Sequence, residues 1–168
     1  SPTPAVLQVV REMERMAQMA ETNLIRAMNT LVTRDQKEID EVYRVEENIN
    51  FLNKEITNYL VPLNQASLPT SDVMRIGALF HVVNDIERIG DHAENVADSA
   101  VQMTNDNVTF SKQGELDLSE MLDMVLKILD ESIEMFAKND LQHLQEIIDI
   151  ENSIDQEERD LQQKHVER

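Results

Sequence analysis

The sequence predicts an all-α protein, and three observations support this prediction. The 168 residues include only 3 glycines and 4 prolines, so few positions interrupt regular structure. Apolar residues recur at spacings of three and four over long stretches, which is the period of an amphipathic helix. No stretch alternates apolar and polar residues over any length, as a half-buried strand would. A helical bundle of one domain, or of two small ones, is therefore expected.

Five helices are expected along the chain, each with an apolar face for the core. The second helix has a clear start, because Asp35 with Glu38 three residues later is typical of a capping box. It is expected to end near Pro62, since proline removes a backbone donor. The longest polar interruption, residues 104–115, predicts the main internal boundary. The expected helical ranges are 5–32, 35–61, 71–103, 116–137 and 141–168.

Composition excludes several classes of function. Acidic residues outnumber basic ones 33 to 15, giving a net charge of -18, which repels nucleic acid and anionic lipid. Neither is expected as a direct partner. There is no cysteine, so a metal would have to be held by carboxylate, amide or imidazole groups. No apolar run is long enough to span a bilayer. The opening SPTPAV lacks an initiator Met, which suggests a fragment of a longer protein.

A row of acids is the most informative local pattern. Glu87, Asp91, Glu94 and Asp98 are spaced i, i+4, i+7 and i+11, so they fall within roughly 60° on one side of a helix. Carboxylates one turn apart can share a hard cation. Gly90 lies inside this row, and a glycine in mid-helix usually has a packing or close-approach reason. The alternative interpretation is a solvated acidic face with no ligand.

Catalytic patterns are missing from the sequence. It has no Gly-rich phosphate loop and no nucleophile paired with a base at motif spacing. None of the 4 histidines follows a glutamate by three residues, as a ferritin-like di-iron enzyme would require. A second polar row on the same segment is interpreted as a helix-contacting or exposed face, with a ligand role as the alternative. Its members are His81, Asp85, Arg88 and His92.

The chain also contains an internal repeat. A shift of 105 residues brings Asp35 onto Asp140, Glu41 onto Glu146 and Glu46 onto Glu151. Apolar positions match at the same offset. We therefore expect a first repeat of three helices in residues 1–104, and the first two helices of a second repeat in residues 115–168. The third helix of the second repeat would lie beyond residue 168.

The segment ERIGDHAENVAD, residues 87–98, resembles the signature of the PhoU family of phosphate-uptake regulators. The resemblance implies tandem three-helix bundles carrying E(D)xxxD motifs on adjacent helices, which can hold iron or other metal ions. Glu87 with Asp91 matches this motif, Glu94 with Asp98 repeats it, and Glu151 with Asp155 matches it on the last helix. Glu46 with Asn50 departs from it, because Asn50 offers a neutral amide oxygen. The implied metal residues are Glu46, Asn50, Glu87, Asp91, Glu94, Asp98, Glu151 and Asp155.

The resemblance also implies a role. The chain would be a cytoplasmic regulator or adaptor of phosphate transport, similar to the PhoU-like tail of bacterial sodium/phosphate cotransporters. Its partner would be a membrane phosphate transporter, or the transporter part of the same polypeptide, at the inner face of the membrane. The metal would be iron, zinc, magnesium or manganese. Two alternatives remain: an acidic helical bundle that binds a partner without metal, and a carboxylate-bridged di-metal enzyme.

The last two expected helices raise a packing problem. Their apolar stripes are too wide for two helices to cover alone. An exposed apolar patch of several hundred Å² is unusual for a soluble monomer. The hairpin is expected either to pack onto the first repeat or to pair with the same hairpin of a second molecule. The symmetric pairing is favoured, so a homo-oligomer is predicted.

Overall fold

The computed structural model describes residues 4–65, 70–138 and 140–167, and all of their regular structure is helical. The side chains of Glu151 and Asp155 lie outside the described ones, and with them the metal role expected of that pair. The five helices confirm the all-α prediction. They are α1 (Pro4–Thr33), α2 (Gln36–Gln65), α3 (Thr70–Asn105), α4 (Lys112–Ala137) and α5 (Leu141–Glu167).

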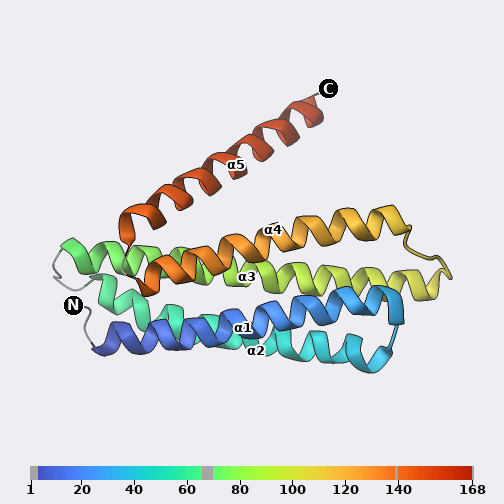
Figure 1. Ribbon diagram of the computed structural model, residues 1–168, viewed down its shortest axis with the longest axis horizontal. Helices are drawn as coiled ribbons and strands as arrows, with labels where there is room; N and C mark the ends of the chain where they lie inside the picture. Colours follow the sequence, from blue (N-terminus) through green and yellow to red (C-terminus); the bar gives the residue numbers. More distant parts are fainter. Residues whose placement is uncertain (1–3, 66–69, 139, 168) are drawn as a thin grey trace.

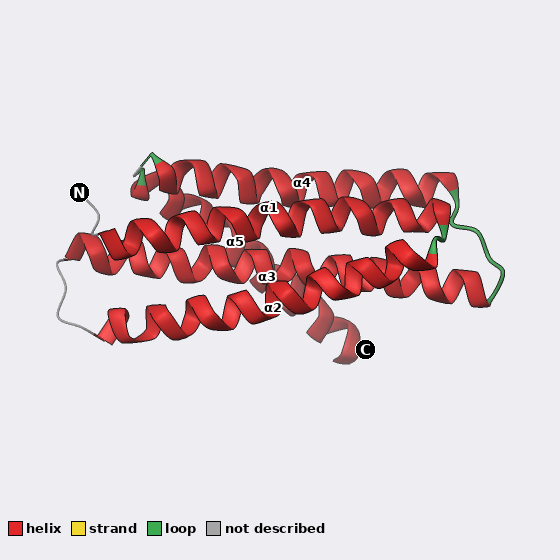
Figure 2. Ribbon diagram, turned by 90° about the horizontal axis from the view of Figure 1, so that it is seen from below, coloured by secondary structure: helices red, strands yellow, loops and turns green. Residues whose placement is uncertain are grey.

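The first four helices run alongside one another in an elongated bundle (Figures 1 and 2). Helices α1, α2 and α3 pack most closely, and each contacts the other two. Their facing apolar side chains form the main core, with Met13, Met16, Leu24, Ile49 and Leu79 almost fully buried. Burying a side chain of this size contributes roughly 1.5–3 kcal/mol, so this core fixes how α2 and α3 face each other.

Helix α4 lies along α1 and α3, whereas α5 leaves the bundle at an angle (Figure 1). The inward side of α4 is buried at Leu122, Leu129 and Phe136. Helix α5 contacts α3 and α4 near its start, where Leu144 and Ile148 are buried. Of the two packing arrangements expected for the last helices, α4 thus shows the first, because it packs onto the preceding helices of the same molecule.

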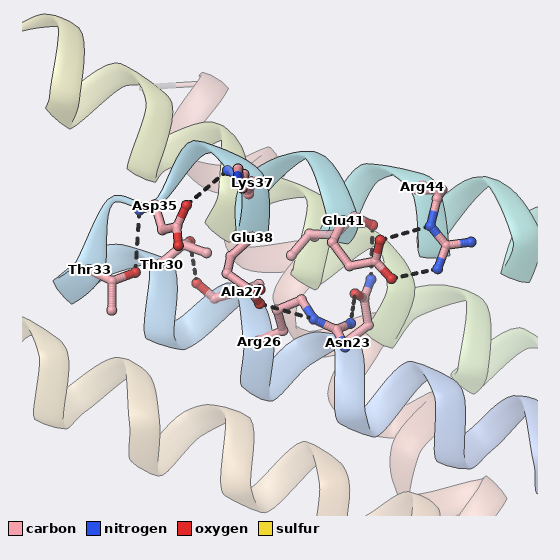
Figure 3. A network of polar contacts seen from close by, with 11 residues as sticks. Asn23, Arg26, Ala27, Thr30, Thr33, Asp35, Lys37, Glu38, Glu41 and Arg44 are labelled. Atoms are coloured by element: carbon pink, nitrogen blue, oxygen red, sulfur yellow. Dashed lines mark hydrogen bonds and ion pairs between the residues drawn. The ribbon is translucent and has the colours of Figure 1, made fainter.

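Polar side chains fix the register of α1 against α2 (Figure 3). Asn23 is fully buried, and its Nδ2 donates to the Val42 carbonyl at 3.0 Å. Arg26 donates from Nη1 to Asn23 Oδ1 at 3.0 Å, and its Nε lies 3.4 Å from Glu38 Oε2. In a regular helix the Val42 carbonyl also accepts from the N–H of Glu46, so this network anchors the turn that carries Glu46.

The turn between α1 and α2 tests the predicted capping of α2. Arg34 adopts φ 53° and its N–H donates to the Thr30 carbonyl at 2.8 Å, which ends α1. Asp35 caps α2 as predicted, because its Oδ1 accepts from the Lys37 N–H at 3.0 Å. Glu38 forms an ion pair with Arg26 rather than completing a capping box.

The predicted end of the second helix at Pro62 is wrong. Helix α2 continues to Gln65 with Pro62 inside its last turn. A proline removes one backbone donor and its ring crowds the carbonyl four residues earlier, but the residues after it can still donate to the preceding turn, and the helix continues for three residues beyond Pro62.

Candidate metal centre

Three carboxylates from two helices meet on the α2–α3 face. Glu46 of α2 and Asp91 and Glu94 of α3 each offer an oxygen, and these oxygens lie within 4.8 Å of one another. Glu46 is buried, Glu94 is half-buried and Asp91 is exposed, so the cluster opens to solvent on one side. This is an arrangement that a hard cation could bridge.

Glu46 is the least ordinary member of the cluster. Its side chain is only 3% exposed, and neither carboxylate oxygen has a hydrogen-bond partner among the described residues. Burial raises the pKa of Glu46 to about 7, and the negative charges of Asp91, Glu94 and Glu87 raise it in the same direction. A buried carboxylate without a donor is costly, so this position would be stabilised by a cation or by a proton.

Gly90 is what allows Glu46 to reach α3. A Cβ at residue 90 would lie 2.9 Å from Glu46 Oε1, 3.0 Å from its Cδ and closer still to Oε2. The other glycine of the same helix, Gly77, has no atom within 4 Å of its equivalent position. Of the two reasons expected for Gly90, packing or close approach, the structure shows a close approach, and the group that approaches is the Glu46 carboxylate.

The other predicted members of the site lie around this centre. Glu87 is exposed, yet its charge acts on Glu46. Asn50 is half-buried one turn further along α2. Asp98 lies at the end of the acidic row, where Tyr43 Oη donates to its Oδ1 at 2.6 Å. Burial and this hydrogen bond raise the pKa of Tyr43, so the phenol stays a proton donor.

Two residues at this face were missed by the sequence-based prediction. Tyr43 was not among the predicted site residues, and nothing in its spacing indicated the bond to Asp98. Asn53 is 6% exposed, and neither polar atom of its amide has a described hydrogen-bond partner. The sequence could have indicated Asn53, because Glu46, Asn50 and Asn53 are spaced i, i+4 and i+7 and so share one face of α2.

The second polar row of α3 forms contacts separate from this cluster. Asp85 is buried and its Oδ2 lies 3.4 Å from His81 Nε2, one turn earlier on the same helix. The described acidic cluster contains no histidine. The helix-contacting interpretation therefore fits Asp85.

The donor set fits a hard metal ion. Its described groups are carboxylate oxygens, supplied by adjacent turns of two packed helices. A bound cation would need carboxylate oxygens that are not engaged elsewhere. The Glu46 oxygens have no described partner, and Gly90 leaves the space in which this carboxylate lies. Oxygen donors favour magnesium, manganese or iron over softer metals.

Comparison with known proteins adds a family relationship. The sequence profile described as "PhoU domain" matches residues 5–100 and 118–168. The chain is 26% identical over 143 residues to the phosphate-specific transport system accessory protein PhoU homolog of Pseudomonas aeruginosa, covering 84% of this chain and 58% of that protein. The homolog of the same name from Clostridium acetobutylicum is 23% identical, with 86% and 65% covered.

A solved structure supports the same relationship. The fold is similar to the crystal structure of PhoU from Pseudomonas aeruginosa, with a TM-score of 0.68 and 28% identity. The match covers 82% of this chain and 66% of that one. The chain thus spans less than two thirds of the length of the two curated relatives named above.

Proposed function

The chain belongs to the PhoU family, and on this premise we propose that it is a regulatory or adaptor domain of phosphate transport that binds a metal ion between α2 and α3. The regulatory part is supported by the names of the relatives, which are accessory proteins of phosphate-specific transport systems. The metal part is supported by one observation above all. The buried Glu46 carboxylate lies unpartnered against Gly90, beside two further carboxylates.

Each residue has a distinct task in this proposal. Glu46 would hold the ion from α2, and Asp91 and Glu94 would hold it from α3. Glu87 and Asp98 extend the negative field along α3, and Asn50 and Asn53 provide neutral amides on the α2 side. A bound divalent or trivalent ion would neutralise mutually repelling carboxylates and join the two helices. Iron, magnesium and manganese suit these donors, while zinc is the less favoured candidate.

Metal analysis with matched variants tests this proposal. The wild-type chain and the Glu87→Ala/Asp91→Ala and Glu46→Gln variants would be purified without chelator, then measured by elemental analysis and calorimetry. Binding should be lost in both variants and kept in Glu47→Gln, which removes an exposed acid of α2. Equal binding by the double variant would refute the site assignment.

We also propose that the domain has no catalytic turnover. The described cluster consists of carboxylates and includes no histidine. Phosphatase, ATPase and oxygen-activation assays should stay at background in repeatedly purified protein. An activity that survives purification and disappears when Asp91 or Glu94 is replaced would overturn this proposal.

The partner and location follow from the same premise. We propose that the domain works at the inner face of the membrane with a phosphate transporter, supplied by another protein or by the same polypeptide. Over the described residues, no helix combines the length and apolar character that crossing a bilayer requires. The division into repeats 1–104 and 115–168, and the predicted homo-oligomer, remain predictions. Light scattering across a dilution series would test the oligomer.

A further inference from the structure

An apolar groove lies between the second half of α1 and the first half of α4. It encloses about 420 Å³ and is lined by residues of these two helices. The acidic cluster belongs to α2 and α3, so the groove is not part of it. The apolar side chains that form most of its surface are Ile25, Met28, Val32, Leu116, Leu122 and Leu126.

Several of these side chains lie open to solvent. Ile25 is 55% exposed, Val32 70% and Leu116 53%. Single exposed apolar residues are common and need no explanation. Here three of them come from two helices and gather around one groove, which is typical of a surface that binds a partner.

The charge around the groove restricts what the partner can be. Glu115 and Asp123 line it, and none of the described lining residues is basic. Asp117 and Glu120, on the same helix, are exposed, and the whole chain carries a net charge of -18. A second copy would bring the same negative charge to the contact, which disfavours self-association here.

We propose that this groove binds a basic amphipathic helix of a partner protein. Apolar residues on one face of that helix would enter between Ile25, Val32 and Leu116. Lysine or arginine residues beside this face would meet Glu115 and Asp123. An amphipathic helix in an apolar groove is a recurrent mode of recognition, and the unbranched Met28 side chain can adapt to different apolar anchors.

A designed peptide tests the groove directly. The probe is a fluorescent amphipathic helix of leucine and lysine, of roughly 18 residues or five turns. It would be titrated against the full chain with chelator present, so that failure of the metal proposal cannot affect the result. The Ile25→Ser/Val32→Ser variant should bind at least roughly tenfold more weakly than wild type. Phe51→Ser, which removes a 63% exposed apolar residue from α2, should bind as wild type does.

Charge variants separate a specific site from general attraction. Glu115→Gln/Asp123→Asn should weaken binding more than Glu47→Gln/Glu55→Gln, which removes the same charge from exposed positions of α2. Circular dichroism confirms that each variant stays helical. The proposal is overturned by equal binding of wild type and Ile25→Ser/Val32→Ser. It is also overturned by a preference for a leucine–glutamate peptide, or by self-association that the two serine substitutions abolish.

Discussion

At the scale of single residues, Gly90 and Glu46 define the candidate centre. The glycine has no side chain, and the space it leaves is filled by the carboxylate of Glu46. The sequence alone does not connect the two residues, because they lie on different helices. The structure explains the pair, because the Glu46 carboxylate lies against α3 beside Asp91 and Glu94.

Replacing Gly90 with alanine should separate metal affinity from stability. The added methyl would displace the Glu46 carboxylate, so the affinity for Mn²⁺ should fall by roughly tenfold or more. The metal-free protein should lose little stability, since alanine favours a helix by up to about 1 kcal/mol over glycine. Calorimetry and urea unfolding would measure both quantities.

Gly77→Ala provides the matched control on the same helix. Its Cβ would meet no atom within 4 Å, so it should stabilise α3 and leave Mn²⁺ affinity unchanged. If both alanine variants bind the ion as wild type does, the contact between Gly90 and Glu46 has no bearing on a metal.

Asn50 allows a test in the opposite direction. It offers an amide on α2 where the related motifs have a carboxylate. Asn50→Asp should tighten Mn²⁺ binding by roughly tenfold, because affinity at oxygen sites rises with the number of charged donors. Asn58→Asp adds the same charge at an exposed position of the same helix. A similar gain from Asn58→Asp would mean that net charge, and not a site, controls binding.

Residue-level prediction from sequence succeeded where helical spacing alone decides which side chains share a face. The shared face of Glu87, Asp91 and Glu94 could be predicted this way, whereas the group that approaches Gly90 could not, because Glu46 lies on another helix. The hydrogen bond from Tyr43 to Asp98 could not, because it depends on how α2 is rotated against α3. That rotation follows from the packing of the core and leaves no local signal.

At the scale of elements, the ends of the helices also show that local contacts could be predicted from sequence and contacts between helices could not. Asp35 could be identified as a cap because the capping bond is local. The role of Glu38 could not, since its partner Arg26 lies on another helix. The predicted end of α2 lay at Pro62, whereas the helix ends at Gln65, because proline disturbs the turn before it and leaves the residues after it able to stay helical.

Removing the cap of α2 should destabilise the bundle without changing the candidate centre. Asp35→Ala leaves the Lys37 N–H without its acceptor and should cost about 1 kcal/mol of unfolding free energy. Urea unfolding with chelator measures this change. Asp40→Ala, an exposed substitution one turn into the same helix, should cost less. Equal losses in the two variants would contradict a capping role for Asp35.

At the scale of the whole molecule, a pair of carboxyl groups lies where α4 meets α1. Glu21 of α1 and Asp130 of α4 line the same cavity. Burial, and then the hydrogen bond and negative charge of Asp130, raise the pKa of Glu21 to about 8. At neutral pH Glu21 therefore keeps a proton that it can share with Asp130.

This pair gives the stability of the protein a defined dependence on pH. In the unfolded chain the pKa of Glu21 returns to 4.5, so the folded state binds more protons between about 4.5 and 8. Stability should therefore fall as the pH rises through this range. Glu21→Gln should remove part of that fall, about 2 kcal/mol after allowance for solvent screening. Urea unfolding between these pH values, with chelator and with Glu14→Gln as control, measures it. Parallel profiles for wild type and Glu21→Gln would exclude the shared proton.

The overall architecture was largely predictable, and the position of α5 was not. Helical periodicity predicts that α4 and α5 have apolar stripes, but it does not say which surface each one covers. Helix α4 covers α1 and α3, whereas α5 has its described buried residues near its start and then leaves the bundle at an angle (Figure 1). The groove between α1 and α4 results from that placement, so no single helix predicts it.

The central claim is that α2 and α3 hold a metal ion at Glu46, and anomalous scattering from crystals soaked in Mn²⁺ tests it most directly. We expect a peak at about 2.0–2.6 Å from carboxylate oxygens of Glu46 and of Asp91 or Glu94, the distance range of hard cations bound to oxygen. The peak should be absent from Glu46→Gln crystals soaked in the same way. A wild-type map with no peak at Glu46, or with peaks only at exposed acids elsewhere, would contradict the claim.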